Sequence, residues 1–518
     1  METPVKKDQI IDICPDSVNE AGDGVARIQG GFVVFCKDLL PGERGKAKVI
    51  KVSANYAVAR VISRENDSGL RREVTCPYYS KGCGGCAYLH VTEEGQLSLA
   101  AQRVADCIER IGGFRADNGS SDAGGLRAGN DPSDAIGADA ARYPGVLPCI
   151  SPADNHFRNK TAYPFFEIDR RIRTGFYARA SHRPVPFEPG KHCPHENPLA
   201  ALIREKLEAF ASEHGITAYD ETTGRGILRH LTVRISDRMG LAMAVITANT
   251  RKLPFESELT ATLSAAVPKL ASLWLCSSTG AGNAVLGGPL RLLFGRTELE
   301  CVLGTTRFLI SPDSFFQVST AGAELLYDTV YRFAGLLPEE QVLDLYCGAG
   351  TIGLYLIDRF RKDHPDAALP KLTGVEIVDS AVDNARRNAV LNGIGEAGFI
   401  CGNVPEVIGR IDPGKLGIVI IDPPRKGTDE VLIASLRALS PSRIIYVSCN
   451  PATLARDLRS ICADGFYRIE AVQPVNMFPD TGHVECVTLL QRMSNTRERT
   501  ITLDVEMEDY HRIKNEGR

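Results

Sequence analysis

The 518-residue chain has no long hydrophobic run, no strong excess of charge and no visible internal repeat. No stretch approaches the roughly 18 uninterrupted apolar residues of a membrane span, and Met1–Asp16 lacks the apolar core of a secretory signal. We therefore expect a soluble cytoplasmic protein without a membrane partner. The 60 Lys and Arg residues nearly balance 64 Asp and Glu residues, so any basic surface for nucleic acid must be local. A hydrophobic content of 43% excludes disorder of the whole chain.

Cysteine, in contrast, is abundant, with 15 residues in the chain. Cys76, Cys83 and Cys86 follow the spacing C-x6-C-x2-C, and Cys193 precedes a proline further along. Clustered thiols in an intracellular chain indicate metal binding or catalysis rather than disulfides. Zinc usually takes two C-x-x-C pairs, whereas an iron–sulfur cluster accepts one such run plus a remote cysteine. The spacing therefore favours a cluster over zinc. Other cysteines in apolar runs are expected in the core, among them Cys276, Cys301 and Cys401.

The segment 1–74 alternates short apolar runs with turn residues. The strand-like runs Gly31–Cys36, Gly45–Lys51 and Tyr56–Ile62 predict a small antiparallel barrel over this segment. A helical pattern follows over Thr92–Gly112. Most of Arg115–Gly145 consists of Ala, Gly, Ser, Asp and Asn. This composition predicts a flexible surface insertion.

The middle of the chain, residues 75–334, holds the cysteines and one basic stretch. Asn155–His192 contains eight Arg and Lys residues against three Asp and Glu residues, interleaved with aromatic residues. This alternation predicts a sheet with aromatic side chains on one face and arginines on the other, where they would meet phosphates. We therefore assign residues 75–334 to a central α+β domain that binds nucleic acid.

Residues 335–493 alternate strand and helix patterns, and a charged tail with one strand-like run follows at 494–518. Five strand patterns are each followed by a helix pattern, and the last two are joined by a loop alone. This order predicts a seven-stranded, mostly parallel Rossmann-like sheet that closes in an antiparallel hairpin. The expected strands are Val342–Tyr346, Leu372–Ile377, Phe399–Gly402, Ile418–Asp422, Ile444–Ser448, Tyr467–Val475 and Val484–Gln491.

A glycine-rich turn follows the first of these strands. Gly348, Gly350 and Gly353 satisfy the dinucleotide pattern G-x-G-x-x-G, and Glu376 at the end of the second strand could hold ribose hydroxyls. NAD would fit this pattern. The acid Asp344 inside the first strand and the closing hairpin are instead features of S-adenosylmethionine-dependent methyltransferases. We therefore favour S-adenosylmethionine as the cofactor.

Three reactive side chains are expected at one edge of the sheet. Asp422 follows the fourth strand, Cys449 follows the fifth, and Glu485 begins the last. Ligands of open parallel sheets bind outside the carboxyl ends of the strands, so Cys449 is more consistent with a nucleophile than with core filling. A thiolate paired with a carboxylate base suits addition to carbon 6 of uracil, methylation of carbon 5 and removal of the carbon 5 proton.

Together these motifs resemble the RNA uracil-5-methyltransferase family, specifically its 23S ribosomal RNA branch. The resemblance covers nearly the whole chain. Ser319 and Thr351 stand where asparagine is frequent in the family. The matching motifs are Phe315-Phe316-Gln317, Asp344–Gly350, Glu376, Asp422–Arg425, Ser448–Pro451 and His483–Glu485.

The resemblance implies a role for each motif. Cys449 would attack the base and Glu485 would accept the proton. The cofactor contacts would come from Gln317, Tyr346, Gly348, Gly350, Thr351, Glu376, Asn403 and Asp422. The cysteines Cys76, Cys83, Cys86 and Cys193 would hold a 4Fe-4S cluster.

The resemblance also implies that the barrel is a TRAM domain, an OB-like RNA-binding module. Bacterial relatives that act on tRNA typically lack both this domain and the cluster, which favours 23S ribosomal RNA as the substrate. We also expect the enzyme to be a monomer. The target uridine would be flipped out of its stack. A tRNA enzyme is the alternative within the family. A non-catalytic RNA-binding iron–sulfur protein is the alternative from another class, but it would need neither Cys449 nor Glu485. A cytosine methyltransferase would carry Pro-Cys where Asp422-Pro stands.

Overall fold

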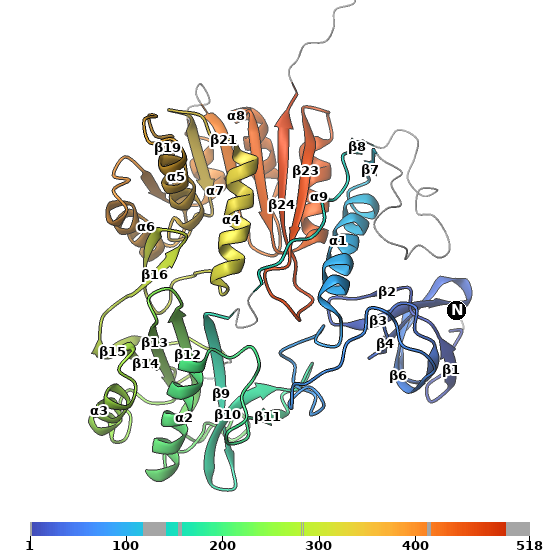
Figure 1. Cartoon of the computed structure of the whole chain (residues 1–518), viewed down its shortest axis with the longest axis vertical. Coiled ribbons are helices and arrows are strands. Elements are labelled where there is room, and N and C mark those ends of the chain that lie inside the picture. The colour runs from blue at the N-terminus through green and yellow to red at the C-terminus, as the bar shows by residue number, and fades with distance from the viewer. Residues whose placement is uncertain are drawn as a thin grey trace, which may run out of the picture.

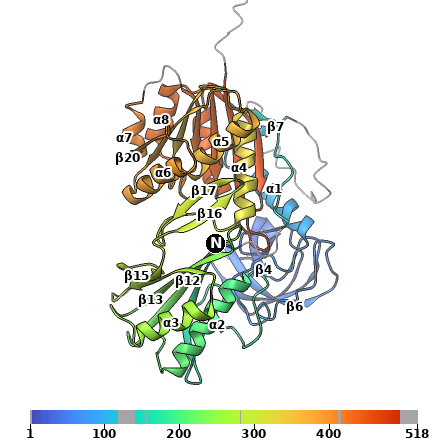
Figure 2. The same cartoon turned by 60° about the vertical axis from the view of Figure 1, so that its left-hand side comes forward.

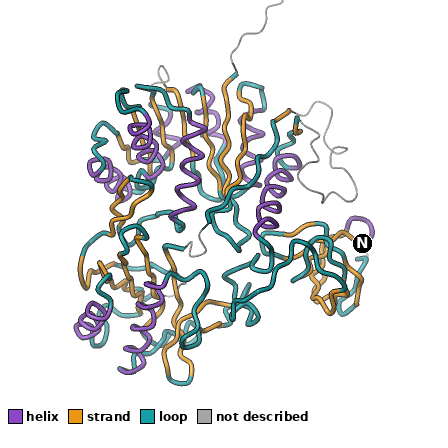
Figure 3. The backbone as a smooth tube through the Cα atoms, in the orientation of Figure 1, coloured by secondary structure: helices purple, strands orange, loops and turns teal. Residues whose placement is uncertain are grey.

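The computed structural model describes residues 3–117, 141–153, 158–280, 282, 284–411 and 416–493, and the statements below concern these residues. Figure 1 shows the amino-terminal barrel beside a central sheet, with the carboxy-terminal sheet above them. Figure 3 shows that strands dominate the first two parts, whereas helices and strands alternate in the last. The expected tail at 494–518 and most of the expected insertion lie outside the described residues.

The barrel is a six-stranded sheet in the order β1-β5-β6-β4-β3-β2. Its neighbours pair antiparallel except β4 and β6, which are parallel. Alternating side chains point inward, among them Val34, Cys36, Ala47 and Val49, and they form its core. The strands are β1 (Ile10–Ile13), β2 (Ser17–Val18), β3 (Asp23–Ile28), β4 (Phe32–Lys37), β5 (Gly45–Val52) and β6 (Tyr56–Arg64), with a 3-10 turn η1 (Gln29–Gly31) between β3 and β4.

The central sheet has seven strands in the order β11-β10-β9-β12-β13-β14-β15. Helices α2 (Pro198–Glu213) and α3 (Glu256–Ala266) pack against one of its faces through a shared apolar core, as Figure 2 shows. A short hairpin, β16 (Leu299–Leu303) and β17 (Thr306–Ile310), leads to the next domain. The sheet strands are β9 (Lys160–Ile168), β10 (Arg171–Tyr177), β11 (Pro184–Pro186), β12 (Leu228–Ser236), β13 (Leu241–Ala248), β14 (Leu270–Ser277) and β15 (Leu290–Gly295).

The carboxy-terminal sheet runs in the order β20-β19-β18-β21-β22-β24-β23. Strand β24 pairs antiparallel with both β22 and β23, and the other neighbouring strands pair parallel. The sequence-based expectation of seven strands with a closing hairpin is therefore confirmed. The strands are β18 (Gln341–Leu345), β19 (Lys371–Glu376), β20 (Gly398–Cys401), β21 (Leu416–Ile421), β22 (Arg443–Ser448), β23 (Tyr467–Val475) and β24 (Glu485–Arg492).

Helices cover both faces of this sheet. One apolar core joins it to α4 (Thr320–Ala334), α5 (Thr351–Asp363) and α6 (Asp379–Leu391). A second core joins its other face to α1 (Glu93–Arg110), α7 (Val404–Ile408), α8 (Glu430–Leu439) and α9 (Pro451–Cys462). Helix α1 precedes the central sheet in sequence yet packs on α9. The boundary expected at residue 334 therefore does not separate the packing units, because an earlier helix completes the later sheet.

The structure corrects the bounds of one expected segment and the burial of one cysteine, while residues 118–140 of the expected insertion lie outside the described residues. The predicted insertion 115–145 begins and ends in ordered structure, since β7 (Arg115–Ala116) pairs with β8 (Arg142–Tyr143) and Tyr143 is buried in the core. The polar, small-residue composition of the segment gave no sign that Tyr143 would be buried. Cys401 is exposed because β20 is an edge strand, whereas Cys276 and Cys301 are buried as expected. None of the described helices is long and apolar enough to cross a membrane.

Candidate active site

The glycine turn after β18 is held by two acids. Asp344 is buried, and its Oδ2 accepts a hydrogen bond from the Gly353 amide at 3.0 Å. A side chain at Gly353 would collide with Leu372 and Asp344, so the close approach of α5 requires glycine there. The other oxygen of Asp344, Oδ1, is buried without a partner among the described residues. Burial, with smaller contributions from the nearby Asp422 and Glu376, raises the pKa of Asp344 to about 7.

Glu376 ties the turn to the end of β19. Its Oε2 accepts from the Gly348 amide at 3.1 Å, and its Oε1 accepts from the amides of Ile377 and Val378 at 2.8 and 2.9 Å. Gly348 and Gly350 have left-handed backbones, with φ of 54° and 76°, and Tyr346 also has a positive φ of 64°. The turn thus has left-handed backbones at both glycines, as the sequence pattern requires, and it brings Gly348 together with the predicted residue Glu376.

A second loop, between β17 and α4, carries Gln317. Asn159, which is buried, donates from Nδ2 to the Gln317 carbonyl at 3.0 Å and to Thr320 Oγ1 at 3.1 Å. Next to Gln317, Phe316 is buried while Phe315 is 69% exposed. Because Asn159 directly precedes the central sheet, that sheet sets the position of the Gln317 loop. No separate signal marked Asn159 in the sequence, where it is one polar residue in a basic stretch.

Helix α4 and the turn meet at Thr351. The Tyr327 and Thr351 hydroxyls lie 3.0 Å apart, and Tyr327 is almost fully buried. Ser319 caps α4 by accepting from the Gly322 amide at 3.1 Å. Asn403 lies apart from these contacts: it is exposed at the start of α7, and its Nδ2 donates to Glu406 Oε1 at 3.3 Å.

Cys449 and Glu485 are brought together by the pairing of β22 with β24. Ser448, just before the cysteine, is directly opposite Cys486, just after the glutamate. Glu485 is 8% exposed, and burial, with a smaller contribution from Asp422, raises its pKa to about 8. Burial also raises the pKa of the Cys449 thiol, and the nearby Glu485 adds to the increase. The three predicted groups therefore share one desolvated, acidic site.

Asp422 completes this site after β21. Burial raises its pKa to about 7. Its loop is held by α9: the Arg425 carbonyl accepts from Asn450 Nδ2 at 3.1 Å and from Thr453 Oγ1 at 3.3 Å. Asn450 also caps α9 by accepting from the Ala452 amide at 3.1 Å. The start of α9 thus fixes both the cysteine and the loop that bears Asp422.

Arg425 is the functional candidate that sequence reasoning left without a role. Its positive charge lowers the pKa of both Cys449 and Glu485 and so opposes the effect of burial. Its Nη2 lies 3.0 Å from His483 Nδ1. Its motif was visible in the sequence, but its proximity to the cysteine depends on loop packing.

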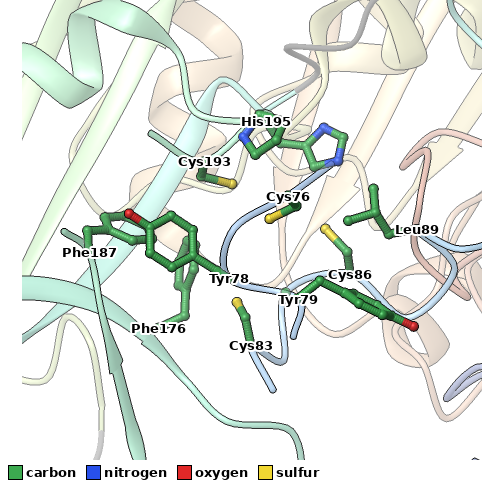
Figure 4. A pocket seen from close by; sticks show the side chains of 12 residues that line it. Cys76, Tyr78, Tyr79, Cys83, Cys86, Leu89, Phe176, Phe187, Cys193 and His195 are labelled. Atoms are coloured by element: carbon green, nitrogen blue, oxygen red, sulfur yellow. The ribbon is translucent and has the colours of Figure 1, made fainter. Parts of the chain in front are cut away.

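The four clustered cysteines line one pocket. Cys76, Cys83, Cys86 and Cys193 surround a largely apolar space walled by Tyr78, Phe176 and Phe187. Figure 4 shows the four sulfur atoms converging on this space. The Gly84 amide donates to the Tyr177 carbonyl at 3.0 Å, which fastens the cysteine loop to β10.

Among the described residues, no group of three or more His, Cys, Asp or Glu side chains is arranged to hold a metal ion. The four cysteines nevertheless line one pocket, and iron–sulfur clusters such as 4Fe-4S take four thiolate ligands. The donor set consists of thiols alone, which is the set such clusters use.

Comparisons with known proteins agree with this geometry. Residues 410–493 match the family described as tRNA (Uracil-5-)-methyltransferase, and residues 9–62 match the TRAM domain. The chain is 35% identical over 495 residues to an uncharacterized RNA methyltransferase of Bacillus cereus, covering 95% of this chain and 99% of that protein. It is 34% identical to another from Clostridium acetobutylicum, covering 95% and 98%.

A solved structure supports the same fold. The Pyrococcus abyssi tRNA (uracil-54, C5)-methyltransferase, in complex with S-adenosyl-L-homocysteine, aligns with a TM-score of 0.67 at 22% identity, covering 93% of this chain and all of that one. The full-length match to RNA methyltransferases and the uracil-5 family match around Cys449 and Glu485 agree with each other. The chain therefore belongs to the RNA (uracil-5-)-methyltransferase family.

Proposed function

We propose that this enzyme transfers a methyl group from S-adenosylmethionine to carbon 5 of a uridine in 23S ribosomal RNA, giving 5-methyluridine. The observation that carries the proposal is the shared site of Cys449, Glu485 and Asp422 at the carboxyl edge of the sheet. A binding module would have no use for a thiol and a buried base placed together.

The residues suit two successive steps. The Cys449 thiolate adds to carbon 6 of the uracil, and the electron pair moves to carbon 5, which then takes the methyl group. Glu485 next removes the proton from carbon 5, the double bond re-forms, and the thiolate leaves. Arg425 favours the thiolate because its charge lowers the pKa of Cys449.

The turn after β18 fits S-adenosylmethionine, which supplies the methyl group bound to a positive sulfonium and also carries an ammonium group. Asp344 has a buried oxygen without a partner among the described residues. Burial also raises the pKa of Asp422. A cationic ligand would compensate both carboxylates, and the turn leaves open space at Gly348, where an added Cβ would meet no atom within 4 Å. Gln317, Tyr346, Gly350, Thr351 and Glu376 would complete the cofactor site. Asn403, exposed after the end of β20, is the remaining candidate.

Cys76, Cys83, Cys86 and Cys193 would hold a 4Fe-4S cluster. The supporting observation is the convergence of four thiols on one pocket with apolar walls. Neither step at Cys449 and Glu485 requires electron transfer, so the cluster would act as a structural element.

The RNA would reach the site across the barrel and the central sheet. Arg170 and Arg171 are exposed at the turn between β9 and β10, where they can meet phosphates. Phe315, which is largely exposed beside Gln317, offers a ring on which an unstacked base can lie.

A tRNA substrate is the second candidate, and one observation favours it. The aligned Pyrococcus abyssi protein is named a tRNA enzyme, and its alignment covers 93% of this chain. The uncovered part is shorter than the barrel, which runs from Ile10 to Arg64, so the alignment includes at least part of the barrel. A barrel of this kind therefore does not by itself separate the two substrates.

The experiment compares transcripts of 23S ribosomal RNA fragments and of tRNA under identical conditions. We expect S-adenosylmethionine-dependent 5-methyluridine, read by nucleoside mass spectrometry, only in the ribosomal transcripts and not with the Cys449→Ala variant. Methylation of tRNA alone would replace the ribosomal proposal with the second candidate. No 5-methyluridine in either RNA would refute the proposed reaction.

A further inference from the structure

The loop between β23 and β24 carries the proposed base at its end. Glu485 is the first residue of β24, and the loop before it spans residues 476–484. At its tip Asp480 has a left-handed backbone with φ of 65° and is 7% exposed. A buried aspartate in this conformation persists only where surrounding contacts hold it.

Those contacts are numerous. The Asp480 carboxylate accepts from Gln96 Nε2 at 2.7 Å and from the Arg72 guanidinium, and it lies 3.0 Å from His195 Nε2. The Asp480 amide donates to Gln96 Oε1 at 2.8 Å, and its carbonyl accepts from the Tyr88 amide at 2.9 Å. Both the side chain and the backbone of this one residue are therefore bound.

The partners come from segments that are remote in sequence from the hairpin. Arg72 and Tyr88 flank the loop of the three clustered cysteines, and His195 lies two residues after Cys193 and lines the same pocket. Gln96 lies in the first turn of α1, which packs on α9. Asp480 thus joins the segments around the cysteine pocket to the loop that ends in Glu485.

The rest of the loop has anchors of its own towards its two ends. The Asn476 amide donates to the Ile150 carbonyl at 2.7 Å, and Met477 and Val484 are buried in the two apolar cores. His483 Nδ1 lies 3.0 Å from Arg425 Nη2 and 3.1 Å from Glu20 Oε1. Asp480 is the residue of this loop whose side chain is held from three directions. Its loss would remove the contacts that hold the tip of the loop, five residues before Glu485.

We propose that Asp480 is a positioning residue for the base, through which the segments around the cysteine pocket set the place of Glu485. This inference rests on the proposed function. Because Glu485 acts only after methyl transfer, misplacing it should slow proton removal and release of the RNA while leaving the formation of the covalent intermediate largely intact.

The test compares the purified full-length Asp480→Ala and Asp480→Asn variants with the wild type and with Glu485→Gln, using an RNA that the wild type methylates. Asp358→Asn is the matched control, since Asp358 on α5 is also a buried aspartate bound to an arginine, Arg361, and its other hydrogen bonds go to Thr305, Thr306 and Lys362 rather than to the segments around the cysteine pocket. The main readout is the ratio of S-adenosylmethionine-dependent covalent protein–RNA complex to released product. Binding of RNA and circular dichroism are measured alongside it.

We expect Asp480→Ala to release product about 10- to 100-fold more slowly and to accumulate the complex. Asp480→Asn keeps the shape and one acceptor oxygen, so it should show a smaller shift in the same direction. Asp358→Asn should leave the ratio unchanged, because loss of folded enzyme lowers complex and product together. If Asp480→Ala does not fold, the ratio of covalent complex to product measured for Asp480→Asn tests the proposal.

Two outcomes separate this inference from the proposed function. A wild-type ratio in the folded Asp480 variants, while Glu485→Gln accumulates the complex, would overturn the inference and leave the proposed function standing. Rapid product release by Glu485→Gln would show that Glu485 is not the base and would overturn both.

Discussion

Replacing Glu485 by Gln is the sharpest test of the site, because the amide keeps the shape and removes the base. Burial raises the pKa of Glu485 to about 8, so about one tenth of the groups are ionised at pH 7 and about half at pH 8. If proton removal limits turnover, the wild-type rate should rise about fivefold between these pH values. The Cys449 pKa is raised as well, so formation of the covalent complex should also accelerate with pH.

The variant separates these two effects. Glu485→Gln should still form the complex, with the pH dependence of Cys449 alone, and should then retain it. A rapid-quench assay at pH 6 to 9, with complex and product resolved on denaturing gels, measures both steps. Cys449→Ala is the control and should form no complex. A complex that persists in Cys449→Ala, or a Glu485→Gln variant that releases product at the wild-type rate, would refute the assignment.

The same carboxyl also affects stability, with a definite sign. Its pKa is about 8 in the folded protein and about 4.5 in the unfolded chain, so the folded state retains a proton that the unfolded state loses. Stability therefore falls as pH rises from about 4.5 to 8, by at most about 5 kcal/mol from this group at about 1.36 kcal/mol per pKa unit. Glu485→Gln should lack this loss, and its stability relative to wild type should increase over that window in urea unfolding. If the difference in unfolding free energy between Glu485→Gln and the wild type did not change between pH 4.5 and 8, Glu485 would not be a buried, protonated carboxyl in the folded protein.

Three further predictions concern the cofactor, the RNA and the cysteine pocket. Because burial raises the pKa of Asp344 to about 7, affinity for S-adenosylmethionine should rise up to about tenfold from pH 6 to 8, and Asp344→Asn should weaken binding and flatten this profile in calorimetry. Replacing Arg170 and Arg171 by Gln should lower the log–log salt slope of RNA binding by about 0.7 to 0.9 for each phosphate that is no longer neutralised, and an unchanged slope would place them away from the RNA. Anaerobically purified protein should contain about four irons per chain and Cys76→Ser should contain fewer, whereas stoichiometric zinc without iron would exclude the cluster.

Much of the carboxy-terminal domain could be predicted from local sequence. Its strands are buried apolar runs bounded by turns, so the pattern marked all seven. Parallel strands place their carboxyl ends at one edge, so the groups that end or follow the strands could be expected together before the fold was known. The cysteine spacing likewise indicated one site, and the four thiols line one pocket.

Other features depend on contacts between distant segments, which periodicity does not record. An amphipathic pattern marks α1 as a helix but not the sheet on which it packs. Tyr143 is buried in the core although it lies near the end of a segment whose composition suggested disorder. Exposure of Cys401 follows from the edge position of β20, which only the strand order sets.

The chemistry of the site divides in the same way. Which groups are present follows from the sequence, because the proposed nucleophile Cys449, the proposed base Glu485 and the glycine turn are residue types at recognisable positions after or at the start of strands. How those groups ionise follows only from the fold, because the raised pKa of Glu485 results from desolvation by all the elements packed around it. We propose that its position likewise depends on Asp480, whose partners Gln96 and His195 belong to much earlier segments of the chain. Burial and long-range hydrogen bonds arise only when the chain has folded.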